Sequence, residues 1–428
     1  MSLAGATQDE VRRHNLAALA RFLHDHGSTS RSELVSHTGL NRSTVGGLIA
    51  DLVGAGLVRE TEPVGRGVGR PSYGVEPVRE RAYVLAIDLR VDRAIVALVG
   101  FGGDVLHRRA HAFRKGQQRA DRIVRDTVHV CHDVLAAAPS GSVLVGVGVG
   151  VPGLVRQPDG LVRFAPNLGW VDVPLGDLVA DALGLSVPVV IGNDSDLGAV
   201  AERQRGIAVG ASNVIYLSGQ VGVGGGIVID GRLLMGAQGY GGEIGHMRVN
   251  PRGRECRCGA VGCWETEIGE PAVALSAGAP PGTPVVTIID SAAAGDKAAR
   301  KGLRTVGTWL GVGVANLVNV FNPDVIVFGG SLREILPATR AAVDAAVGEP
   351  SRHPPSTSCW RCRRWGTTPR FSGPRSPPSR RSWTTRSESL REESTGRAGA
   401  SPASPSAAER HDRDTGTSAR EAAKARPA

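Results

Sequence analysis

The chain has 428 residues, which is enough for two or three domains, and it combines 58 glycines with few aromatic residues. No apolar run is long enough to cross a membrane and the first residues lack a secretory signal core, so we expect a cytoplasmic protein without a membrane partner. The net charge of +9 does not mark the body as a nucleic-acid binder, because residues 351–428 alone carry 16 Lys and Arg against 7 Asp and Glu.

Residues 1–78 predict a winged helix-turn-helix DNA-binding domain, mainly α-helical. Apolar residues at helical spacing predict a helix over residues 11–26, a second helix begins at the capping box of Ser30, and a third follows the cap residue Asn41. A short turn between the last two helices is typical of a helix-turn-helix. The candidate DNA contacts at the start of the third helix are Arg42, Ser43 and Thr44.

The glycine- and arginine-rich segment over residues 65–72 lies between two short predicted strands and predicts the wing. Glycines keep such a tip narrow, and an arginine there can enter a minor groove, so Arg66 and Arg70 are further candidate DNA contacts. The alternative is a three-helix protein-contact domain with a flexible linker. Residues 1–80 hold nine basic and nine acidic side chains, so strong phosphate binding would need dimerisation.

Residues 79–347 predict a two-lobed α/β region, with a first lobe over 79–195 and a second over 196–347. Predicted strands cover 83–89, 94–99, 104–106, 143–151, 186–191, 214–217 and 227–229, and predicted helices cover 120–138 and 197–205. The continuous apolar run over 143–151 is expected to be a buried strand. A glycine-rich turn containing Gly219, Gly222, Gly224, Gly225 and Gly226 is expected before the last strand. Asn193 and Asp194 follow a buried strand, which is where open α/β sheets bind ligands.

The segment 239–267 carries the strongest local signal in the chain. It holds His246, Cys256, Cys258 and Cys263, a Cys₃His set with the ligand count of a structural zinc site. The alternative is three reduced cytosolic cysteines and an unrelated histidine. Glu243 and Glu265 flank the set and are better suited to holding a polar molecule beside the metal than to binding the metal itself.

The same segment matches the pattern G-G-E-I-G-H followed by C-x-C-G-x-x-G-C-x-E, and over residues 9–347 the chain resembles the ROK family of repressors, open-reading-frame proteins and sugar kinases, particularly its winged-helix regulators. The resemblance implies the actin-like, ribonuclease-H-like fold of hexokinase. It also implies monosaccharide contacts from Asn167, Asn193, Asp194, Glu243, His246 and Glu265, with Asp194 as the general base in the kinases.

Two degenerate phosphate loops favour a regulator over a kinase. The kinases of this family resemble D-x-G-x-T at the first loop, where this chain has Asp88, Arg90 and Asp92, and the second loop at Gly219 and Gly222 lacks the usual hydroxyl. We therefore predict a sugar-responsive transcriptional repressor of carbohydrate-utilisation genes that binds double-stranded operator DNA as a homodimer or homotetramer, with structural zinc and without ATP. The alternative is an ATP-dependent, glucokinase-like sugar kinase with an appended DNA-binding domain, and a sugar sensor that does not bind DNA ranks third.

From residue 348 the sequence is rich in Arg, Ser, Pro and Thr and has no apolar period. Codons for this stretch, read one nucleotide earlier, can encode an Ala- and Leu-rich segment like the expected family ending. We therefore interpret residues 348–428 as an out-of-frame translation. The alternative is a genuine disordered basic tail, in which Cys359 and Cys362 resemble a metal-binding pair.

Overall fold

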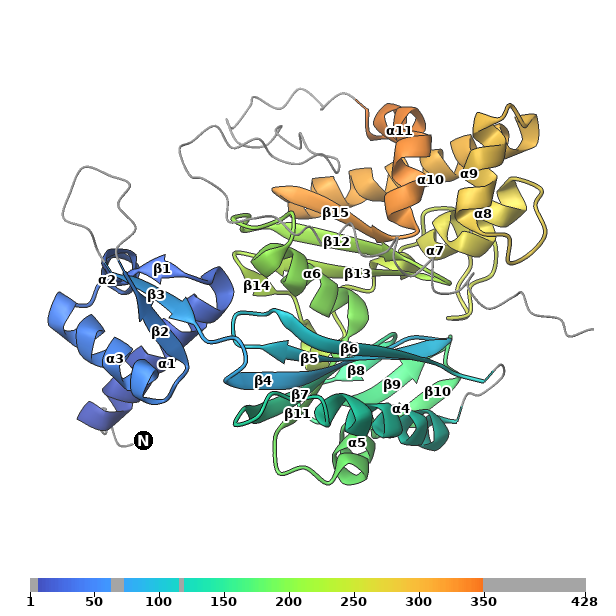
Figure 1. The fold of residues 1–428 in the computed structure, drawn as a ribbon. Coiled ribbons are helices and arrows are strands. Elements are labelled where there is room, and N and C mark those ends of the chain that lie inside the picture. Colours follow the sequence, from blue (N-terminus) through green and yellow to red (C-terminus); the bar gives the residue numbers. More distant parts are fainter. Residues whose placement is uncertain (1–6, 63–72, 115–118, 349–428) are drawn as a thin grey trace, which may run out of the picture. The chain divides into compact units, whose positions relative to one another are not determined.

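The computed structural model describes residues 7–62, 73–114 and 119–348 (Figure 1). Two sets of expectations therefore lie outside the described residues: the wing contacts Arg66 and Arg70, and the tail from residue 349. Among the described residues, no helix is both long and apolar enough to cross a membrane.

The N-terminal residues form three helices and a small antiparallel sheet. The helices are α1 (Gln8–His26), α2 (Arg31–Thr38) and α3 (Arg42–Gly54), and the sheet has the order β1-β3-β2, with β1 at Thr29–Ser30, β2 at Val58–Thr61 and β3 at Gly74–Pro77. Both predicted caps are present: the Ser30 side chain accepts from the Glu33 amide, and Asn41 accepts from the Thr44 amide. The apolar faces of all three helices meet in one core, which includes Leu19, Leu23, Leu34, Leu48, Ile49 and Leu52.

The first lobe of the following region is built on a five-stranded sheet of order β11-β7-β4-β5-β6. Its strands are β4 (Ala82–Leu89), β5 (Arg93–Gly100), β6 (Val105–Ala112), β7 (Val143–Val151) and β11 (Val189–Asn193). The β4–β7 and β7–β11 pairs are parallel, and β4, β5 and β6 form antiparallel pairs. Helices α4 (Ala120–Leu135) and α5 (Leu175–Leu183) pack on this sheet and close its core (Figure 1).

Strand β7 is less buried than its continuous apolar sequence predicted. Val147 and Val149 are buried and pair with β4 residues in the main core, whereas Val143 and Val145 are 50% and 51% exposed. Among the described residues the large buried side chains of this sheet gather with α4 and α5. The prediction of a strand buried along its whole length was therefore wrong for the first residues of β7.

A second, three-stranded sheet in this lobe was missed by the sequence analysis. It consists of β8 (Leu154–Arg156), β9 (Leu161–Ala165) and β10 (Trp170–Val173), which pair in sequence order. Strands of three to five residues are too short to show a clear alternation of apolar and polar positions. This sheet matters for function because the turn between β9 and β10 carries Asn167.

The second lobe is built on a sheet of order β14-β13-β12-β15. Its strands are β12 (Val214–Gly219), β13 (Val223–Ile229), β14 (Arg232–Leu233) and β15 (Val325–Gly330). Helix α6 (Asp194–Arg205) packs on β12 and β13, and the remaining helices are α7 (Trp264–Ile268), α8 (Glu270–Ser276), α9 (Val285–Ala293), α10 (Lys297–Phe321) and α11 (Leu332–Val347). Two 3₁₀ turns, η1 (Ala237–Gly239) and η2 (Ile244–His246), lead into the cysteine-rich segment.

The predicted glycine-rich turn is shorter than expected, because Gly224, Gly225 and Gly226 lie inside β13. Their role is close packing. A Cβ atom on Gly224 would lie 2.2 Å from the Ser195 hydroxyl oxygen, and one on Gly226 would lie 2.5 Å from the Ser195 carbonyl oxygen. Only glycine therefore allows β13 to approach the first turn of α6 this closely.

Candidate functional site

One cavity of about 210 Å³ brings together residues from both lobes. The six sugar-binding residues predicted from the sequence all line it: Asn167, Asn193, Asp194, Glu243, His246 and Glu265. These side chains come from the β9–β10 turn, the start of α6, the η2 turn and α7. Segments separated by nearly one hundred residues in the sequence thus meet in a single polar pocket.

The start of α6 forms the floor of this pocket. Asn193 caps the helix, since its side-chain oxygen accepts the amides of Ser195 and Asp196. Its amide nitrogen donates to the Gly153 carbonyl oxygen at 2.9 Å. Asn193 thereby ties the helix start to the first lobe and places Asp194 in the pocket. Burial raises the pKa of Asp194.

A buried carboxyl group, Asp196, lies one residue beyond the pocket-lining Ser195. Its side chain is 6% exposed, and its Oδ1 atom has no hydrogen-bond partner in the described part of the chain. Burial raises the pKa of Asp196 to about 7, and the nearby carboxylates of Glu243 and Asp194 contribute to the shift. Burial also raises the pKa of Glu243. Three neighbouring carboxyl groups in and beside the pocket, those of Asp194, Asp196 and Glu243, thus all have raised pKa values.

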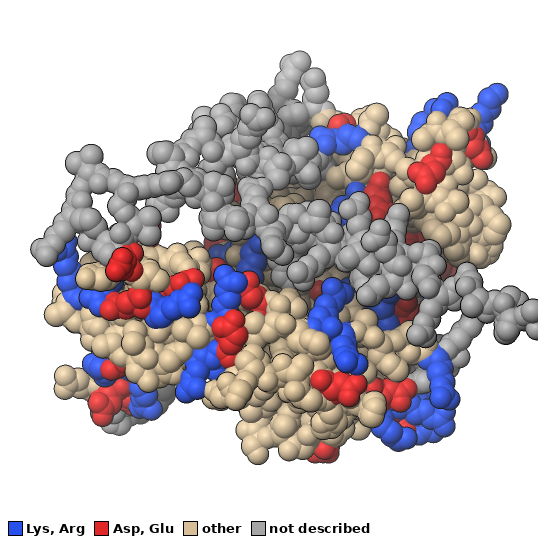
Figure 2. All heavy atoms as spheres, viewed as in Figure 1, with Lys and Arg blue, Asp and Glu red and all other residues tan. Residues whose placement is uncertain are grey.

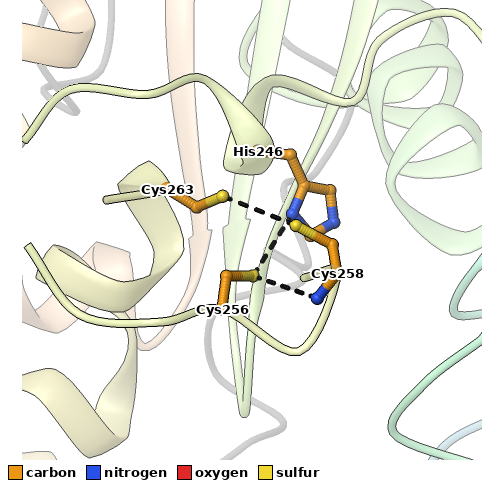
Figure 3. A group of neighbouring side chains, drawn as sticks. All are labelled: His246, Cys256, Cys258 and Cys263. Carbon is orange, nitrogen blue, oxygen red and sulfur yellow. Dashed lines mark hydrogen bonds between the residues drawn. The ribbon is translucent and has the colours of Figure 1, made fainter. Parts of the chain in front are cut away.

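His246 and the three cysteines form the second part of the site (Figure 3). Their ligand atoms all lie within 4.8 Å of one another. The His246 Nδ1 to Cys256 Sγ distance and the Cys258 Sγ to Cys263 Sγ distance are both 3.6 Å. Four ligands around a zinc ion at the usual bond lengths are separated by roughly 3.5 to 4 Å, so this cluster fits a tetrahedral metal ion.

The two ring nitrogens of His246 face different parts of the site. Nδ1 lies against the cysteine cluster, and Nε2 lies 3.8 Å from Glu243 Oε2. A histidine that binds a metal through Nδ1 keeps its proton on Nε2. His246 can therefore hold the metal and offer an N–H donor toward the pocket carboxylates.

The segment predicted to be a degenerate first phosphate loop contains an ion pair between Arg90 and Asp88. Arg90 donates to Asp88 Oδ2 from two guanidinium nitrogens, at 2.9 and 2.8 Å. Asp92 is exposed and lies 3.4 Å from the Arg93 guanidinium. In the second loop, Gly222 lines the pocket, whereas a Cβ atom on Gly219 would lie 2.7 Å from the Leu332 side chain.

The predicted DNA contacts lie at the beginning of α3. Arg42 and Ser43 are exposed and Thr44 is half-buried. The Ser43 hydroxyl donates to the Asn41 side-chain oxygen at 2.7 Å. Figure 2 shows Lys and Arg side chains interspersed with Asp and Glu side chains over the described part of the visible face of the protein.

The ROK family model matches residues 84–363, about two thirds of the chain. The chain belongs to the ROK family. It is 32% identical to a putative xylose repressor of Caldicellulosiruptor sp. (strain Rt8B.4) over 340 residues, which cover 74% of this chain and 83% of the relative.

Two solved ROK structures share the fold. One is a ROK family transcriptional regulator, a homologue of the E. coli MLC protein, with 26% identity, a TM-score of 0.65, and coverage of 79% of this chain and 88% of the other. The second is a ROK glucokinase from Streptomyces griseus in complex with glucose and AMPPNP, with 29% identity, a TM-score of 0.55, and coverage of 63% and 92%. The expected actin-like architecture of the ROK region is thus confirmed.

Arg257 is a pocket residue of this ROK domain that the sequence analysis missed. Arg257 lines the cavity, and its guanidinium donates to the Asn167 side-chain oxygen at 2.7 Å. It lies between Cys256 and Cys258, so two members of the Cys₃His cluster flank it in the sequence. Its place between two predicted metal ligands was the available signal in the sequence.

Proposed function

We propose that this chain is a sugar-responsive DNA-binding repressor of carbohydrate-utilisation genes. The observation that carries the proposal is the single pocket in which all six predicted sugar contacts meet beside a Cys₃His cluster. A sugar presents neighbouring hydroxyl groups, and carboxylates and amides pair with them specifically. The similarity to a putative xylose repressor and to a ROK transcriptional regulator supports the same function.

In this proposal the N-terminal residues act as a winged helix-turn-helix that binds operator DNA. The order of three helices and a small antiparallel sheet supports this assignment, as does the exposure of Arg42 and Ser43 at the start of α3. The chain acts as a homodimer or homotetramer in the cytoplasm, with domains over residues 1–78, 79–195 and 196–347. Sugar binding changes operator affinity because the sugar prefers one arrangement of the protein over another.

The metal in this proposal is zinc, held by His246, Cys256, Cys258 and Cys263. Three thiolates and one imidazole at near-tetrahedral spacing are the donor set that zinc prefers. Zinc there is structural, because four protein ligands fill its coordination shell. It holds the segment that carries Arg257 in place, and it orients the His246 ring so that Nε2 faces the pocket.

The test is operator binding with and without sugar. Genomic fragments selected by the protein are titrated in the presence of D-xylose, D-glucose or neither. We expect one sugar to change the operator affinity and Asp194→Ala to abolish the change, while the exposed control Asp181→Ala behaves as the parent. An operator affinity that no monosaccharide alters, or an equal response from Asp194→Ala, would contradict the proposal.

A second candidate function is ATP-dependent phosphorylation of a sugar. It is favoured by the half-buried Asp194 in the pocket and by the similarity to a glucokinase solved with glucose and AMPPNP. It is disfavoured by the Arg90–Asp88 pair at the first phosphate loop. Steady turnover of ATP and D-glucose by the purified protein, lost in Asp194→Ala, would establish the kinase and overturn the purely regulatory reading.

A further inference from the structure

Arg257 and Asn167 meet from opposite lobes of the ROK domain. Asn167 lies in the β9–β10 turn of the first lobe, and Arg257 lies between two metal ligands in the second. The guanidinium NH1 donates to Asn167 Oδ1 at 2.7 Å, and both residues line the pocket. A pocket residue of one lobe is thus held by a residue that the metal cluster places.

This contact decides which end of the Asn167 carboxamide faces the ligand. A guanidinium group has only donors, so it can bind the oxygen of the amide and not its NH₂ group. The NH₂ group then lies on the side of Gly222, where a Cβ atom would be 3.6 Å from Asn167 Nδ2 and 2.6 Å from Glu265 Oε2. The amide donor and the Glu265 carboxylate consequently face the same small space in the pocket.

The orientation matters because three of the other polar side chains that line the pocket, Asp194, Glu243 and Glu265, are carboxylates. Ionised Asp194, Glu243 and Glu265 can only accept hydrogen bonds, so they bind sugar hydroxyls through the hydroxyl protons. The Asn167 NH₂ group adds a donor to these acceptors. A sugar hydroxyl that donates its proton to the Glu265 carboxylate still has lone pairs, and these can accept a hydrogen bond from the Asn167 NH₂ group. If the amide turned over, its oxygen would face Glu265 and the pair would present only acceptors.

We propose that Arg257 is a positioning and specificity residue that holds Asn167 as a hydrogen-bond donor, so that the site selects monosaccharides with a hydroxyl able to donate to Glu265 and accept from Asn167. The inference rests on the proposed sugar-binding function and specifies which kind of sugar hydroxyl group the pocket recognises. Arg257 acts through Asn167 and needs no contact with the sugar.

The experiment measures sugar affinity by calorimetry with D-glucose and D-xylose, followed by the monodeoxy analogues of the sugar that binds. We expect Arg257→Ala to weaken binding about tenfold, which is the scale of one lost hydrogen bond. We also expect it to lose discrimination against one deoxy analogue only. Arg257→Lys keeps a donor for Asn167 Oδ1 and should restore part of the affinity. The exposed neighbour Arg252 provides the matched control, Arg252→Ala.

A double-mutant cycle separates positioning from a general loss of structure. If Arg257 acts through Asn167, Arg257→Ala has no further effect on affinity in an Asn167→Ala background. Metal content equal to the parent protein shows that each variant keeps the cysteine cluster. A loss that is equal for all deoxy analogues, or that persists in the Asn167→Ala background, would overturn the inference and leave the sugar-binding function intact. Failure of the parent protein to bind any neutral monosaccharide would overturn both.

Discussion

The buried Asp196 gives a direct test of the electrostatics of the pocket through the pH dependence of stability. Its pKa is raised from an ordinary value of 3.8 to about 7 by burial and by the neighbouring carboxylates of Glu243 and Asp194. The folded protein therefore keeps a proton that the unfolded chain releases above pH 4. Folding stability consequently falls as the pH rises from about 4 to about 7, and it levels off above that window.

The magnitude follows from the two pKa values. Each pKa unit corresponds to about 1.4 kcal/mol, so the folded state loses up to about 4 kcal/mol across this window because of Asp196. Asp196→Asn removes the titration while keeping the shape of the side chain. We expect the variant to gain stability relative to the parent as the pH rises, by as much as about 4 kcal/mol between pH 4 and pH 8.

The assay is urea or thermal unfolding of both proteins at half-unit pH steps, with the difference plotted against pH. Changes in other carboxyl groups and in the metal ligands affect both proteins and largely cancel in this difference. Asp181→Asn, an exposed carboxyl group on α5, should give a flat difference. A flat difference for Asp196→Asn would show that its carboxyl group ionises normally in the folded state, and the argument from its burial would fail.

Three further predictions concern the packing around the metal cluster. The Trp264 indole nitrogen donates a hydrogen bond to the Trp309 carbonyl oxygen at 2.8 Å. Trp264→Phe should therefore lower the free energy of unfolding by about 1–3 kcal/mol without changing the metal stoichiometry. Unchanged stability would contradict this prediction. Gly313→Ala would place a Cβ atom 2.0 Å from the same indole ring, and a melting temperature equal to the parent's would refute the expected loss of about 1–3 kcal/mol. Gly262 has a φ of +78°, and Gly262→Ala would place a Cβ atom 1.7 Å from the Asn250 carbonyl oxygen. We therefore expect the variant to bind less than one metal ion per chain, as measured by metal analysis. Full metal loading would show that the loop adapts to the side chain.

The local elements that the sequence predicted well are those with a short-range cause. The caps at Ser30 and Asn41 need only a side chain and an amide two or three residues away, and both are present. The Cys₃His cluster was predictable for the same reason, because its four ligands lie within 18 residues and the intervening glycines allow the chain to turn. Such features depend on residues that lie close together in the sequence.

Features that depend on contacts between distant segments were not predictable in this way. The sequence showed that Gly224, Gly225 and Gly226 matter, but a turn and a closely packed strand use the same residue. Only the approach of Ser195 to β13 distinguishes the two cases. The Arg257–Asn167 hydrogen bond joins residues ninety positions apart, and nothing in either local sequence specifies its partner.

The Arg90–Asp88 ion pair shows what the departure from the kinase pattern does at the predicted first phosphate loop. A phosphate-binding turn needs free donors and a backbone that a phosphate can approach closely, which is why glycine is common there. In this chain the guanidinium of Arg90 already binds Asp88 through two nitrogens, and the same cation lowers the pKa of Asp194 against the larger effect of burial. Arg90 thus supplies a positive charge beside Asp88 and Asp194 from within the protein. In a kinase, the bound metal–nucleotide complex would supply the positive charge at this place. Replacing Arg90 with glycine would remove the cation beside Asp88 and Asp194. Because the Arg90 and Asp88 side chains are 37% and 41% exposed, water screens this ion pair, and that change alone should lower stability only slightly and should not create a nucleotide site.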